Sequence, residues 1–594
     1  MKKLKIYIYL NLALAAVFSF LCISFHKDVS FLAFPLALVF TAALFYVSVI
    51  MLFKKNEVKH VGMVRRFFQY EPFVFISAFV IQRAGENACP YALDLAAALI
   101  WVLISVLSFM IRFVLAEKRV AKISPEWKEY FDANPKKVYH GLRRVGIEVA
   151  EWVDALVQAA FMIVLLNIFV FQLYEIPSES MVSTFLIGDR VAVGKTFAGP
   201  KFPLSDVGIP YINKYKRGDI VVFRNPHYSN DRKNEVKTFL SQFVYMLTLT
   251  LVKSNVDENG VMKADPLVKR VVGLPGEQLL LMDGNLYSRT KDSDFKQIDD
   301  DNGWAVWNLN ALPDSVKKKV RDFPVSQDVY DDTLLTEHER RDLDLESVKL
   351  ECMSLSDRFD KLAVGSPDAD GKDLIKQDDL LAYTLMTTTS KSILKLLTAD
   401  GGSSWFRHYM NDWYEGLGDL RGYTENGTVT GKHLVGGDLY TDSLFRLNLM
   451  FKLTLGRIIV RSGELLSDNA DDIAWSTDSY RNGQIQVLQR LITYITFMDQ
   501  RNMGLFPAND DSGNPSYIPE DCYFMMGDNR YNSADMRHSY ESTCVPLYKG
   551  DEYSVTYYTN LAPQYVNKNR ILGKASLRIW PLNRFGNPGK KTSR

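Results

Sequence analysis

The sequence is poor in the residue types that most often mark a metal or thiol site. It has five cysteines in 594 residues, at positions 22, 89, 352, 522 and 544. They form no C-x-x-C pair and have no metal-ligand spacing, which argues against a zinc centre or a dithiol active site. A disulfide between Cys522 and Cys544 stays open, because it needs an oxidising compartment and a proximity that sequence alone does not give.

Excess charge and catalytic histidines are also lacking. The formal net charge is +1, so electrostatics give no reason to propose a nucleic acid as partner. Of the eight histidines, five follow residue 174, and none lies in a recognisable triad setting. No internal repeat is visible. If a hydroxyl in this chain acts as a nucleophile, its base is therefore expected to be something other than histidine.

Long apolar runs, in contrast, dominate the first 174 residues. A transmembrane helix needs about 20 mostly apolar residues. Four segments meet this length: residues 6–25, 31–53, 91–116 and 152–174. A fifth candidate, residues 67–82, is shorter and contains Glu71. A chain of this length exceeds one compact core, and everything after the last apolar run reads as a soluble, charged protein.

Basic residues predict how these segments are oriented. The first apolar run follows MKKLK, but no A-x-A-like site comes after it, so it is expected to stay as an anchor. The N-terminus and the basic segments 54–66 and 117–144 should all be cytoplasmic. That requires residues 67–82 and 91–116 to cross as a hairpin. The last span then delivers residue 175 onward to the non-cytoplasmic side.

Short strand-like segments follow the last span. Residues 188–195, 217–226, 265–277 and 522–540 combine β-branched apolar residues with turn signals. Lys269 is the unusual residue, because it stands among Val268, Val271 and Val272. It is either an edge lysine whose amine reaches solvent or a base kept in apolar surroundings.

Lysine can activate a serine only when it is neutral. Free lysine has a pKa of about 10.4, so roughly one in 2,500 is neutral at pH 7. Desolvation in an apolar site lowers that pKa. The stretch YEIPSESMVSTFLIGD, residues 174–189, directly follows the last span and supplies hydroxyl groups. A serine–lysine pair is thus the functional reading of Lys269.

Four segments in order resemble the type I signal peptidase (leader peptidase) family. They are IPSESM (176–181), RGDIVVF (217–223), VKRVVGLPGE (268–277) and MMGDNRYNSADMR (525–537), and ILGKASLRIWPLNRFG (571–586) adds to the match. Members of this family are membrane-bound serine proteases that remove signal peptides on the outer face of the membrane. The resemblance covers less than a third of the chain.

Carried over by position, the resemblance implies a role for each matching residue. Ser180 is the nucleophile and Lys269 the general base. Ser178, together with the Ser180 backbone N–H, forms the oxyanion hole, and such a donor contributes about 3 kcal/mol. Ser533 positions the lysine amine. The charged residues that support the site are Arg270, Asp528, Arg530, Asp535 and Arg537. Three departures leave the pair intact: Ser183 replaces a proline, Met536 a serine and Glu277 an aspartate.

The resemblance also implies the substrates and partners. Signal peptides of exported preproteins end in small residues, A-x-A-like, before the cut. The expected walls of a shallow binding site are Ile176, Met181 and Val268, which ordinary core packing would explain equally well. No metal and no cofactor is needed. Membrane lipid is a further partner, the protein-translocation machinery is a candidate partner, and the implied location is the bacterial inner membrane, with the catalytic domain on the periplasmic side.

The predicted fold is a set of N-terminal transmembrane α-helices followed by a mainly-β signal-peptidase-type catalytic domain with a large, mostly helical insertion. We divide the chain into a multi-span region (1–151), the last span (152–174), the β-domain (175–299 and 506–594) and the accessory insertion (300–505). Residues 383–399, 443–467 and 483–499 have helical apolar periodicity. Residues 239–252 are too short to span, and either touch lipid or lie beneath the insertion.

Two other readings compete with an active protease. One is a catalytically inactive, membrane-anchored scaffold or binding protein whose insertion is the working part. Retention of all four matching residues, Ser178, Ser180, Lys269 and Ser533, argues against it, because a scaffold needs none of them. The other is a transporter with an outer domain, but the few intramembrane charges form no evident relay.

Overall fold

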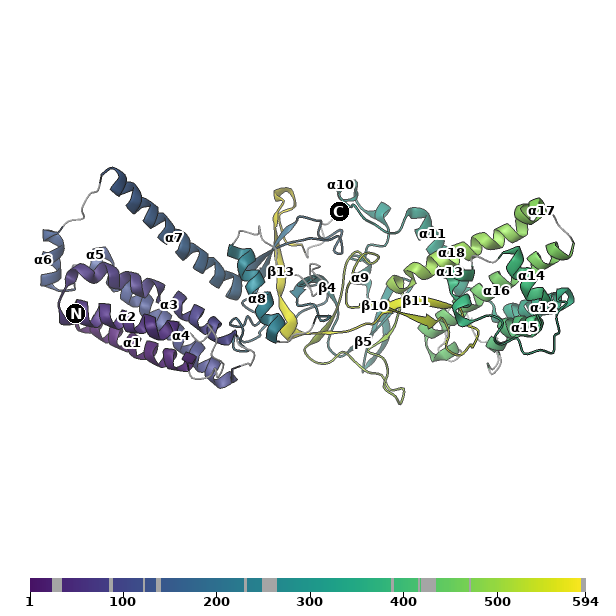
Figure 1. Cartoon of the computed structure of the whole chain (residues 1–594), viewed down its shortest axis with the longest axis horizontal. Coiled ribbons are helices and arrows are strands. Elements are labelled where there is room, and N and C mark those ends of the chain that lie inside the picture. The colour runs from purple at the N-terminus through teal and green to yellow at the C-terminus, as the bar shows by residue number, and fades with distance from the viewer. Residues whose placement is uncertain are drawn as a thin grey trace.

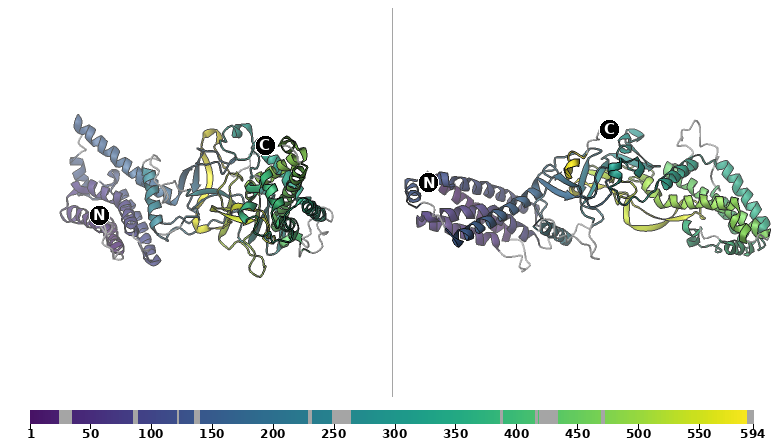
Figure 2. Two further views of the ribbon diagram at one scale, coloured as in Figure 1. Left: turned by 45° about the vertical axis from the view of Figure 1, so that its right-hand side comes forward. Right: turned by 90° about the horizontal axis from the view of Figure 1, so that it is seen from above.

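The computed structural model describes residues 1–23, 35–84, 89–120, 123–134, 140–228, 232–247, 264–385, 389–414, 417, 434–468 and 472–588. The molecule is elongated (Figures 1 and 2): N-terminal helices form one end, β-sheets lie in the middle, and a second group of helices forms the other end. The chain reaches the far end and returns, because the last strand, β13, lies back in the central sheets.

Four helices at the N-terminal end are long and apolar enough to cross a membrane. They are α1 (Lys2–Ile23), α2 (Leu36–Phe45) with its π-helical continuation η2 (Tyr46–Lys54), α4 (Tyr91–Val114) and α7 (Leu142–Phe169). The short helices α5 (Glu117–Val120) and α6 (Pro125–Ala133) lie between α4 and α7. The four long apolar helices, α1, α2 with η2, α4 and α7, correspond to the four full-length apolar runs of the sequence.

The weak fifth candidate, residues 67–82, lies in α3 (Val61–Arg83), which packs against α1, α2 and α4. Its composition is more polar than that of the four spans. Glu71 is nevertheless fully buried, where it accepts hydrogen bonds from Asn11 Nδ2 of α1 (3.0 Å) and from Ser108 of α4. A carboxyl group in a helical bundle needs such partners. Helix α3 therefore belongs to the bundle through its polar contacts as well as its apolar ones.

The boundaries predicted for the last span, 152–174, are wrong at both ends. Helix α7 begins ten residues earlier, at Leu142, and ends at Phe169, and residues 171–175 form strand β1 (Phe171–Glu175) instead. Carbonyl groups at a helix C-terminus lack intrahelical partners. Lys195 Nζ donates a hydrogen bond to the Asn167 carbonyl (2.9 Å), and Thr196 Oγ1 donates one to the Phe169 carbonyl (3.0 Å). These tertiary contacts end the helix and join it directly to the sheet.

Two antiparallel sheets and a hairpin form the middle of the molecule. The larger sheet has the order β1-β2-β13-β3-β4-β9-β12 and the smaller one β7-β6-β5-β8. The remaining strand bounds of the larger sheet are Arg190–Gly194 (β2), Ile220–Phe223 (β3), Leu267–Gly273 (β4), Cys522–Met526 (β9), Val566–Asn567 (β12) and Ile571–Trp580 (β13). Those of the smaller sheet are Glu277–Met282 (β5), Asn285–Thr290 (β6), Ser293–Gln297 (β7) and Met503–Phe506 (β8).

The four strand-like segments of the sequence are found as β2, β3, β4 and β9. Strand β4 lies between β3 and β9, so it is paired on both sides. Its residues Leu267, Val271 and Val272 enter a core shared with the smaller sheet. Val271 is fully buried in that core, as are Leu279 and Phe524. Lys269 is thus on a central strand and not on an edge, which removes the edge-lysine reading of the sequence.

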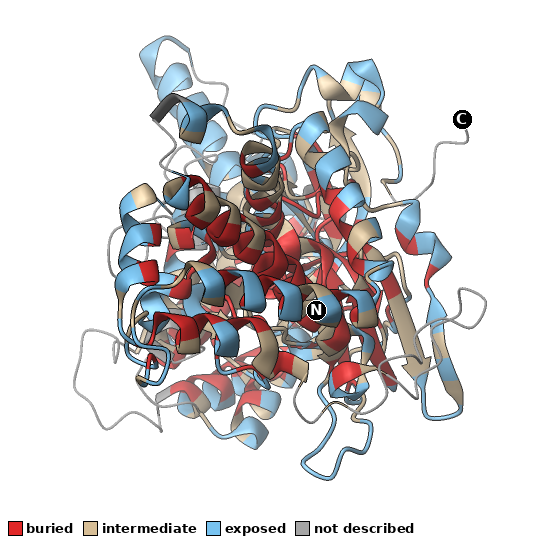
Figure 3. Cartoon of the chain, turned by 90° about the vertical axis from the view of Figure 1, so that its right-hand side faces the viewer, coloured by how far each residue is buried: buried red, intermediate tan, exposed pale blue. Residues whose placement is uncertain are grey.

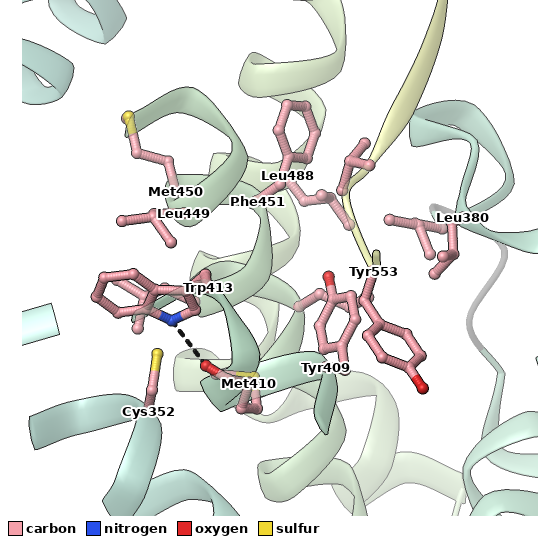
Figure 4. Close-up of a cluster of buried hydrophobic side chains, with 14 of the residues drawn as sticks. Cys352, Leu380, Tyr409, Met410, Trp413, Leu449, Met450, Phe451, Leu488 and Tyr553 are labelled. Atoms are coloured by element: carbon pink, nitrogen blue, oxygen red, sulfur yellow. Dashed lines mark hydrogen bonds between the residues drawn. The ribbon is translucent and has the colours of Figure 1, made fainter. Parts of the chain in front are cut away.

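A helical unit, defined here as residues 327–501, forms the far end. Its helices are α11 (Gln327–Arg341), α12 (Leu345–Leu362), α13 (Ala382–Leu385), α14 (Ser390–Thr398), α15 (Gly402–Asn411), α16 (Leu439–Ser467), α17 (Asp472–Thr477) and α18 (Ser479–Arg501). The short helices α9 (Asp299–Asn302) and α10 (Asp314–Lys317) precede it. Buried residues gather inside the unit (Figure 3), and α16 carries more of them than any other single helix. In its core the Trp413 indole N–H donates to the Met410 carbonyl at 2.8 Å (Figure 4).

The hairpin of β10 (His538–Pro546) and β11 (Thr556–Leu561) extends from the sheets into this unit. Tyr553 and Val555 belong to the same apolar core as α16. Beside them, Lys452 and Asp551 form a fully buried ion pair at 2.5 Å, and Asn448 Nδ2 donates to the same carboxylate at 2.8 Å. The tip of a hairpin that follows the predicted β-domain motifs is thus part of the helical core.

Two alternatives left open by the sequence also receive an answer. Residues 239–247 belong to α8 (Arg232–Leu247), which contacts α7 at the membrane-helix end, away from the helical unit (Figure 1). Residues 248–252 lie outside the described residues. The two cysteines considered for a disulfide, Cys522 and Cys544, are both free thiols, one buried in β9 and the other exposed on β10.

The buried ion pair predicts a large stability difference between two neighbouring acids. Asp551→Ala leaves the Lys452 ammonium buried without its carboxylate, which should destabilise the protein by about 3 kcal/mol. Glu552→Ala is the matched control, because Glu552 pairs with Lys372 in an exposed ion pair and should cost less than about 1 kcal/mol. Thermal unfolding of the purified full chain measures both. Equal melting temperatures for the two variants would contradict the buried pair.

Candidate active site

The loop between β1 and β2 carries Ser180. Two turns shape it, with Val182 N–H donating to the Glu179 carbonyl at 3.1 Å and Phe185 N–H to the Met181 carbonyl at 2.8 Å. Met181 and Phe185 are almost completely buried and fix the loop to the sheet. Ser180, directly before Met181, stays partly exposed. The loop thus presents the Ser180 hydroxyl to solvent, while its buried side chains fix it to the sheet.

Lys269 approaches this hydroxyl from the middle of β4. Its Nζ lies 2.7 Å from Ser180 Oγ, although the two residues are 89 positions apart in the chain. The side chain is only 3% exposed. Burial disfavours the charged ammonium and lowers the pKa of Lys269 to about 8, even though the carboxylates of Asp535 and Asp528 act in the opposite direction. Near neutral pH a substantial fraction of this amine is therefore able to accept a proton.

The loop between β9 and β10 holds the backbone around Ser180. Asn529 donates its backbone N–H to the Ser180 carbonyl (3.1 Å) and its side-chain amide to the Glu179 carbonyl (3.2 Å). Gly527 lies so close that an added Cβ would stand 2.5 Å from the Ser180 carbonyl oxygen. Any larger residue there would displace the serine. The glycine of the MGDN segment is thus required by a close approach of two loops.

Ser533 lies in the same contact, but it does not show the hydrogen bond predicted for it. Its hydroxyl is buried against Gly527. Within the described part of the chain this hydroxyl has no hydrogen-bond partner, so a bond to Lys269 is not formed. The structure therefore brings Ser533 next to the serine–lysine pair and leaves its role as a prediction.

Ser178 lies on the solvent side of the nucleophile. It is exposed, and its Oγ donates to Ser180 Oγ at 3.4 Å. No hydrogen bond recorded among the described residues uses the Ser180 backbone N–H. A hydroxyl and a free N–H therefore flank the Ser180 oxygen. Two such donors are the groups that stabilise a developing oxyanion in acyl transfer.

Behind the pair, Arg270 and Asp528 form a buried bidentate ion pair. Arg270 Nε and Nη2 donate to the two carboxylate oxygens at 2.7 and 2.6 Å. Thr184, four residues after the nucleophile, donates to the same carboxylate at 2.5 Å. The guanidinium also lies 4.7 Å from the ring centre of Trp304. Because neighbouring residues of a strand point to opposite faces, Lys269 serves the front of the site and Arg270 its rear.

Two further buried ion pairs fix the loop after β9. Arg537 Nε and Nη2 each lie 2.9 Å from an Asp535 oxygen, and the Gly527 N–H donates to Asp535 at 2.8 Å. Burial alone would raise the pKa of Asp535, but the Arg537 guanidinium outweighs burial and holds it well below its usual range. Arg530 pairs with Asp301 of α9. Sequence reasoning missed Asp301, because no motif marks an acid 229 positions away.

The three residues predicted as walls of a substrate site are brought together. Ile176, Met181 and Val268 belong to one small apolar cluster on the β1–β2 side of the sheet. The first two are at most 3% exposed, whereas Val268 is half-buried. Of the three predicted wall residues, Val268 alone is accessible, and the arrangement fits both a binding role and ordinary packing.

In the described part of the chain, no histidine is placed to act as the base. Among the described residues no histidine is hydrogen-bonded to Ser180. His538, which follows the catalytic loop, is buried, and burial lowers its pKa to about 4, so it stays neutral. The described residues also contain no group of three or more His, Cys, Asp or Glu side chains that could hold a metal ion. A serine hydroxyl beside a buried amine is an arrangement that is able to carry out acyl transfer.

Glu179, between the two serines, is a second residue that the sequence did not reveal. It is 6% exposed, and its carboxylate oxygens accept the backbone N–H groups of Arg321 (2.7 Å) and Asp322 (2.9 Å). The Asp322 carbonyl in turn accepts from Asn532 at 3.1 Å. One carboxylate thus connects the nucleophile loop to the segment that leads into the helical unit. The only sequence signal was a charged residue inside an otherwise small-residue motif.

Comparison with known families gives a match in the regions that carry this site. The model of the family "Signal peptidase, peptidase S26" matches residues 149–348 and 473–580, just over half of the chain. The residues between these ranges, 349–472, lie in the helical unit and are not matched. The matched part contains every residue of the site described above.

Several curated proteins named signal peptidase I are similar to this chain. The protein of Buchnera aphidicola subsp. Baizongia pistaciae is 32% identical over 135 residues, which is 22% of this chain and 42% of that protein. That of Haemophilus influenzae is 29% identical over 133 residues, 22% of this chain and 36% of that protein. That of Bacillus licheniformis is 26% identical over 145 residues, which is 24% of this chain and 50% of that protein. The chain spans half or less of the length of these relatives.

The Glu179 contacts predict a local loss of structure. Glu179→Ala removes the acceptor of two N–H groups, and each such charged hydrogen bond contributes about 1.5–3 kcal/mol. Hydrogen exchange at the amides of Arg321 and Asp322 should accelerate at least about tenfold. Glu175→Ala is the control, because Glu175 is an exposed β1 residue beside Arg190. Unchanged protection in Glu179→Ala would show that the carboxylate does not hold this segment.

Proposed function

The chain belongs to the peptidase S26 family of signal peptidases, and on this premise we propose that it is a membrane-bound serine endopeptidase that removes N-terminal signal peptides from exported proteins after small residues. The observation that carries the proposal is the 2.7 Å contact between Ser180 Oγ and the buried amine of Lys269. A buried lysine is destabilising unless a partner or a function retains it.

In the proposed reaction Lys269 takes the Ser180 proton while Ser180 Oγ attacks the carbonyl carbon of the scissile peptide bond. The carbon–nitrogen bond breaks, and the ammonium of Lys269 returns its proton to the leaving amine of the mature protein. The signal peptide stays attached to Ser180 as an ester. Lys269, neutral again, deprotonates a water molecule, which attacks the ester carbonyl. The ester bond then breaks, the Lys269 ammonium returns the proton to Ser180 Oγ, and the signal peptide is released.

The donors around Ser180 complete the proposed mechanism. The negative oxygen of each tetrahedral intermediate is assigned to the Ser178 hydroxyl and the Ser180 backbone N–H, because these two groups flank the reacting oxygen. Ser533 keeps its proposed role in orienting the amine during turnover. Three buried ion pairs hold the loops of the site in place without taking part in proton transfer. They are Arg270 with Asp528, Arg537 with Asp535 and Arg530 with Asp301.

Substrate selection is proposed to follow from the shallow floor beside the pair. A peptide lying along the chain before Ser180 and the start of β4 would place its small side chains on Ile176, Met181 and Val268. Large residues have no depth to enter there. The peptide would be supplied in an extended form, since both flanking segments are strands or strand extensions.

The N-terminal helices support an assignment to the bacterial cytoplasmic membrane. With Lys2, Lys3 and Lys5 on the inner side, the last span α7 would carry the catalytic domain to the periplasmic face, with α3 crossing between α2 and α4. Helix α7 passes into β1 after a single residue, which would keep Ser180 close to the lipid surface. The helical unit is proposed to recognise substrates or the translocation machinery.

An inactive scaffold is the second candidate, and the site speaks against it. A scaffold would gain nothing from keeping an amine dehydrated beside a partly exposed hydroxyl. Substitution of Lys269 by an apolar residue would be expected to stabilise such a protein. The unmatched residues 349–472 are the one feature in favour of an additional, non-catalytic task.

The dyad predicts a sharp loss of activity in two variants. Purified full chain in detergent should cut a peptide that has an A-x-A site, and Ser180→Ala and Lys269→Ala should each lower kcat by about 10⁴-fold or more. Ser576→Ala and Lys291→Ala, both at exposed positions of the sheets, should cut at the native rate. Mass spectrometry of the products identifies the cleaved bond. Cutting by either dyad variant at the native rate would refute the assigned roles.

The low pKa of the base predicts how the rate depends on pH. Only neutral Lys269 can accept the serine proton, so kcat/KM should fall about tenfold for each unit of pH below the pKa and level off above it. With the pKa of Lys269 lowered to about 8, the rise should be complete about two units below that expected for free lysine. A profile that is flat from about pH 6 to about pH 9 would exclude a lysine base.

A further inference from the structure

A large groove lies next to the nucleophile loop but outside the serine–lysine pair. It encloses about 1080 Å³ and is bounded by residues 302–316, by residues 578–588 and by Ser183 and Thr184. Neither Ser180 nor Lys269 lines it, whereas Arg270 does. Since Arg270 points to the opposite face of β4 from Lys269, the groove opens behind the site of bond cleavage.

The walls of this groove combine aromatic rings with arginines. Trp304, Trp307 and Phe585 provide ring faces, and Phe585 is 59% exposed. The arginines are Arg270, Arg578 and Arg584. No aspartate or glutamate is among the described residues that line the groove. A surface of this composition favours extended peptide with acidic or carbonyl-rich character.

The arginines retain a net positive charge after their internal contacts are counted. Arg270 is paired with Asp528, and Arg584 Nη1 lies 2.8 Å from Asp189. Arg578 donates to the Thr184 carbonyl at 2.8 Å, and its closest carboxylate oxygen, on Asp189, is 3.9 Å away. Three guanidinium groups thus share two carboxylates, and one positive charge is left toward the groove.

The position of the groove sets which part of a bound peptide could reach it. Ser183 and Thr184 follow Ser180 by three and four residues, so their Cα atoms are at most about 11 and 15 Å from that of the nucleophile. An extended peptide covers this distance in about four or five residues. The near edge of the groove is therefore within reach of residues about four or five positions from the cut, and the rest of the groove is within reach of residues up to about ten positions away.

We propose that this groove binds the early mature segment of the substrate, about five to ten residues after the cut, and selects acidic and aromatic residues there. The proposal rests on the proposed function and names a second recognition element for it. The other half of the substrate, the signal peptide, is already assigned to the floor formed by Ile176, Met181 and Val268.

Charge complementarity supports this occupant. Lysine and arginine that closely follow an apolar segment hinder its transfer across the membrane. The first residues of an exported mature chain are for this reason poor in positive charge. A groove with a surplus positive charge and no lining carboxylate accepts such a segment and disfavours a basic one.

A pair of charge variants at one exposed position tests the groove directly. Ala311 lines it, is exposed and is not part of the catalytic machinery. The probe is a fluorescent ten-residue peptide that contains two glutamates and one phenylalanine, without a signal sequence, titrated into full-length Ser180→Ala protein in detergent. Ala311→Glu should weaken binding about threefold to fivefold, and Ala311→Lys should not weaken it. Phe585→Ala should also weaken it.

Two results of this titration would overturn the proposal. One is equal affinity for the acidic peptide and for its counterpart with lysines in place of the glutamates. The other is affinity that neither Ala311→Glu nor Phe585→Ala changes. Binding that depends on these wall residues in the stated direction supports the groove, and because it is measured without cleavage, it does not depend on activity.

Cleavage kinetics then connect the groove to turnover. A substrate with glutamates six and eight positions after the cut should have a KM about threefold lower than its lysine counterpart, at unchanged kcat. Substrates truncated three residues after the cut should show no difference between Ala311→Glu and Ala311→Lys. An Ala311 effect that persists in truncated substrates would overturn the proposal. Failure of the native protein to cut any substrate, with groove binding intact, would refute the proposed function alone.

Discussion

The candidate active site depends on one contact, in which the buried Lys269 amine lies against the Ser180 hydroxyl and out of contact with water. Water would restore the ammonium, which cannot accept the serine proton in the proposed reaction. Exclusion of water is achieved by placing the lysine on a central strand, paired on both sides. The same position prevents the side chain from reaching solvent. A change that opened the sheet at β4 would therefore change both the pKa of the lysine and its distance from the serine.

Buried ion pairs keep the surroundings of this contact rigid. Arg270, Arg530 and Arg537 each have a carboxylate partner out of contact with solvent. Such pairs contribute little net stability, but removing one member destabilises the protein strongly, because the other charge stays buried without a partner. They consequently tolerate only one arrangement of the two loops that meet at the nucleophile. In that arrangement Gly527 lies so close to the Ser180 carbonyl that no larger residue fits at its position.

The helical unit is tied to the same loops and is not an independent attachment. Glu179 bonds the segment entering the unit, and Arg537 donates to the Gln500 carbonyl at the end of α18, where the chain leaves it. Arg501 forms a buried pair with Glu337 of α11. Forces or ligands that act on this unit would thus reach the residues on both sides of the dyad. The groove behind the nucleophile lies along this junction, since residues 302–316 lead from the sheets toward the unit.

The resemblance of four short segments to a known family implied the pairing of Ser180 with Lys269, which are 89 positions apart. The sequence by itself indicated strands β2, β3, β4 and β9 and the long apolar helices of the N-terminal end, because apolar periodicity and turn residues act within a few positions along the chain. It did not determine where α7 ends, that the hairpin tip joins the helical core, or that Asp301 and Glu179 support the site. Those features depend on partners that are about 25 to more than 200 residues away, such as Lys195 for Asn167 and Arg530 for Asp301. Only the folded chain brings such partners together, and only folding removes the water that would otherwise keep Lys269 charged.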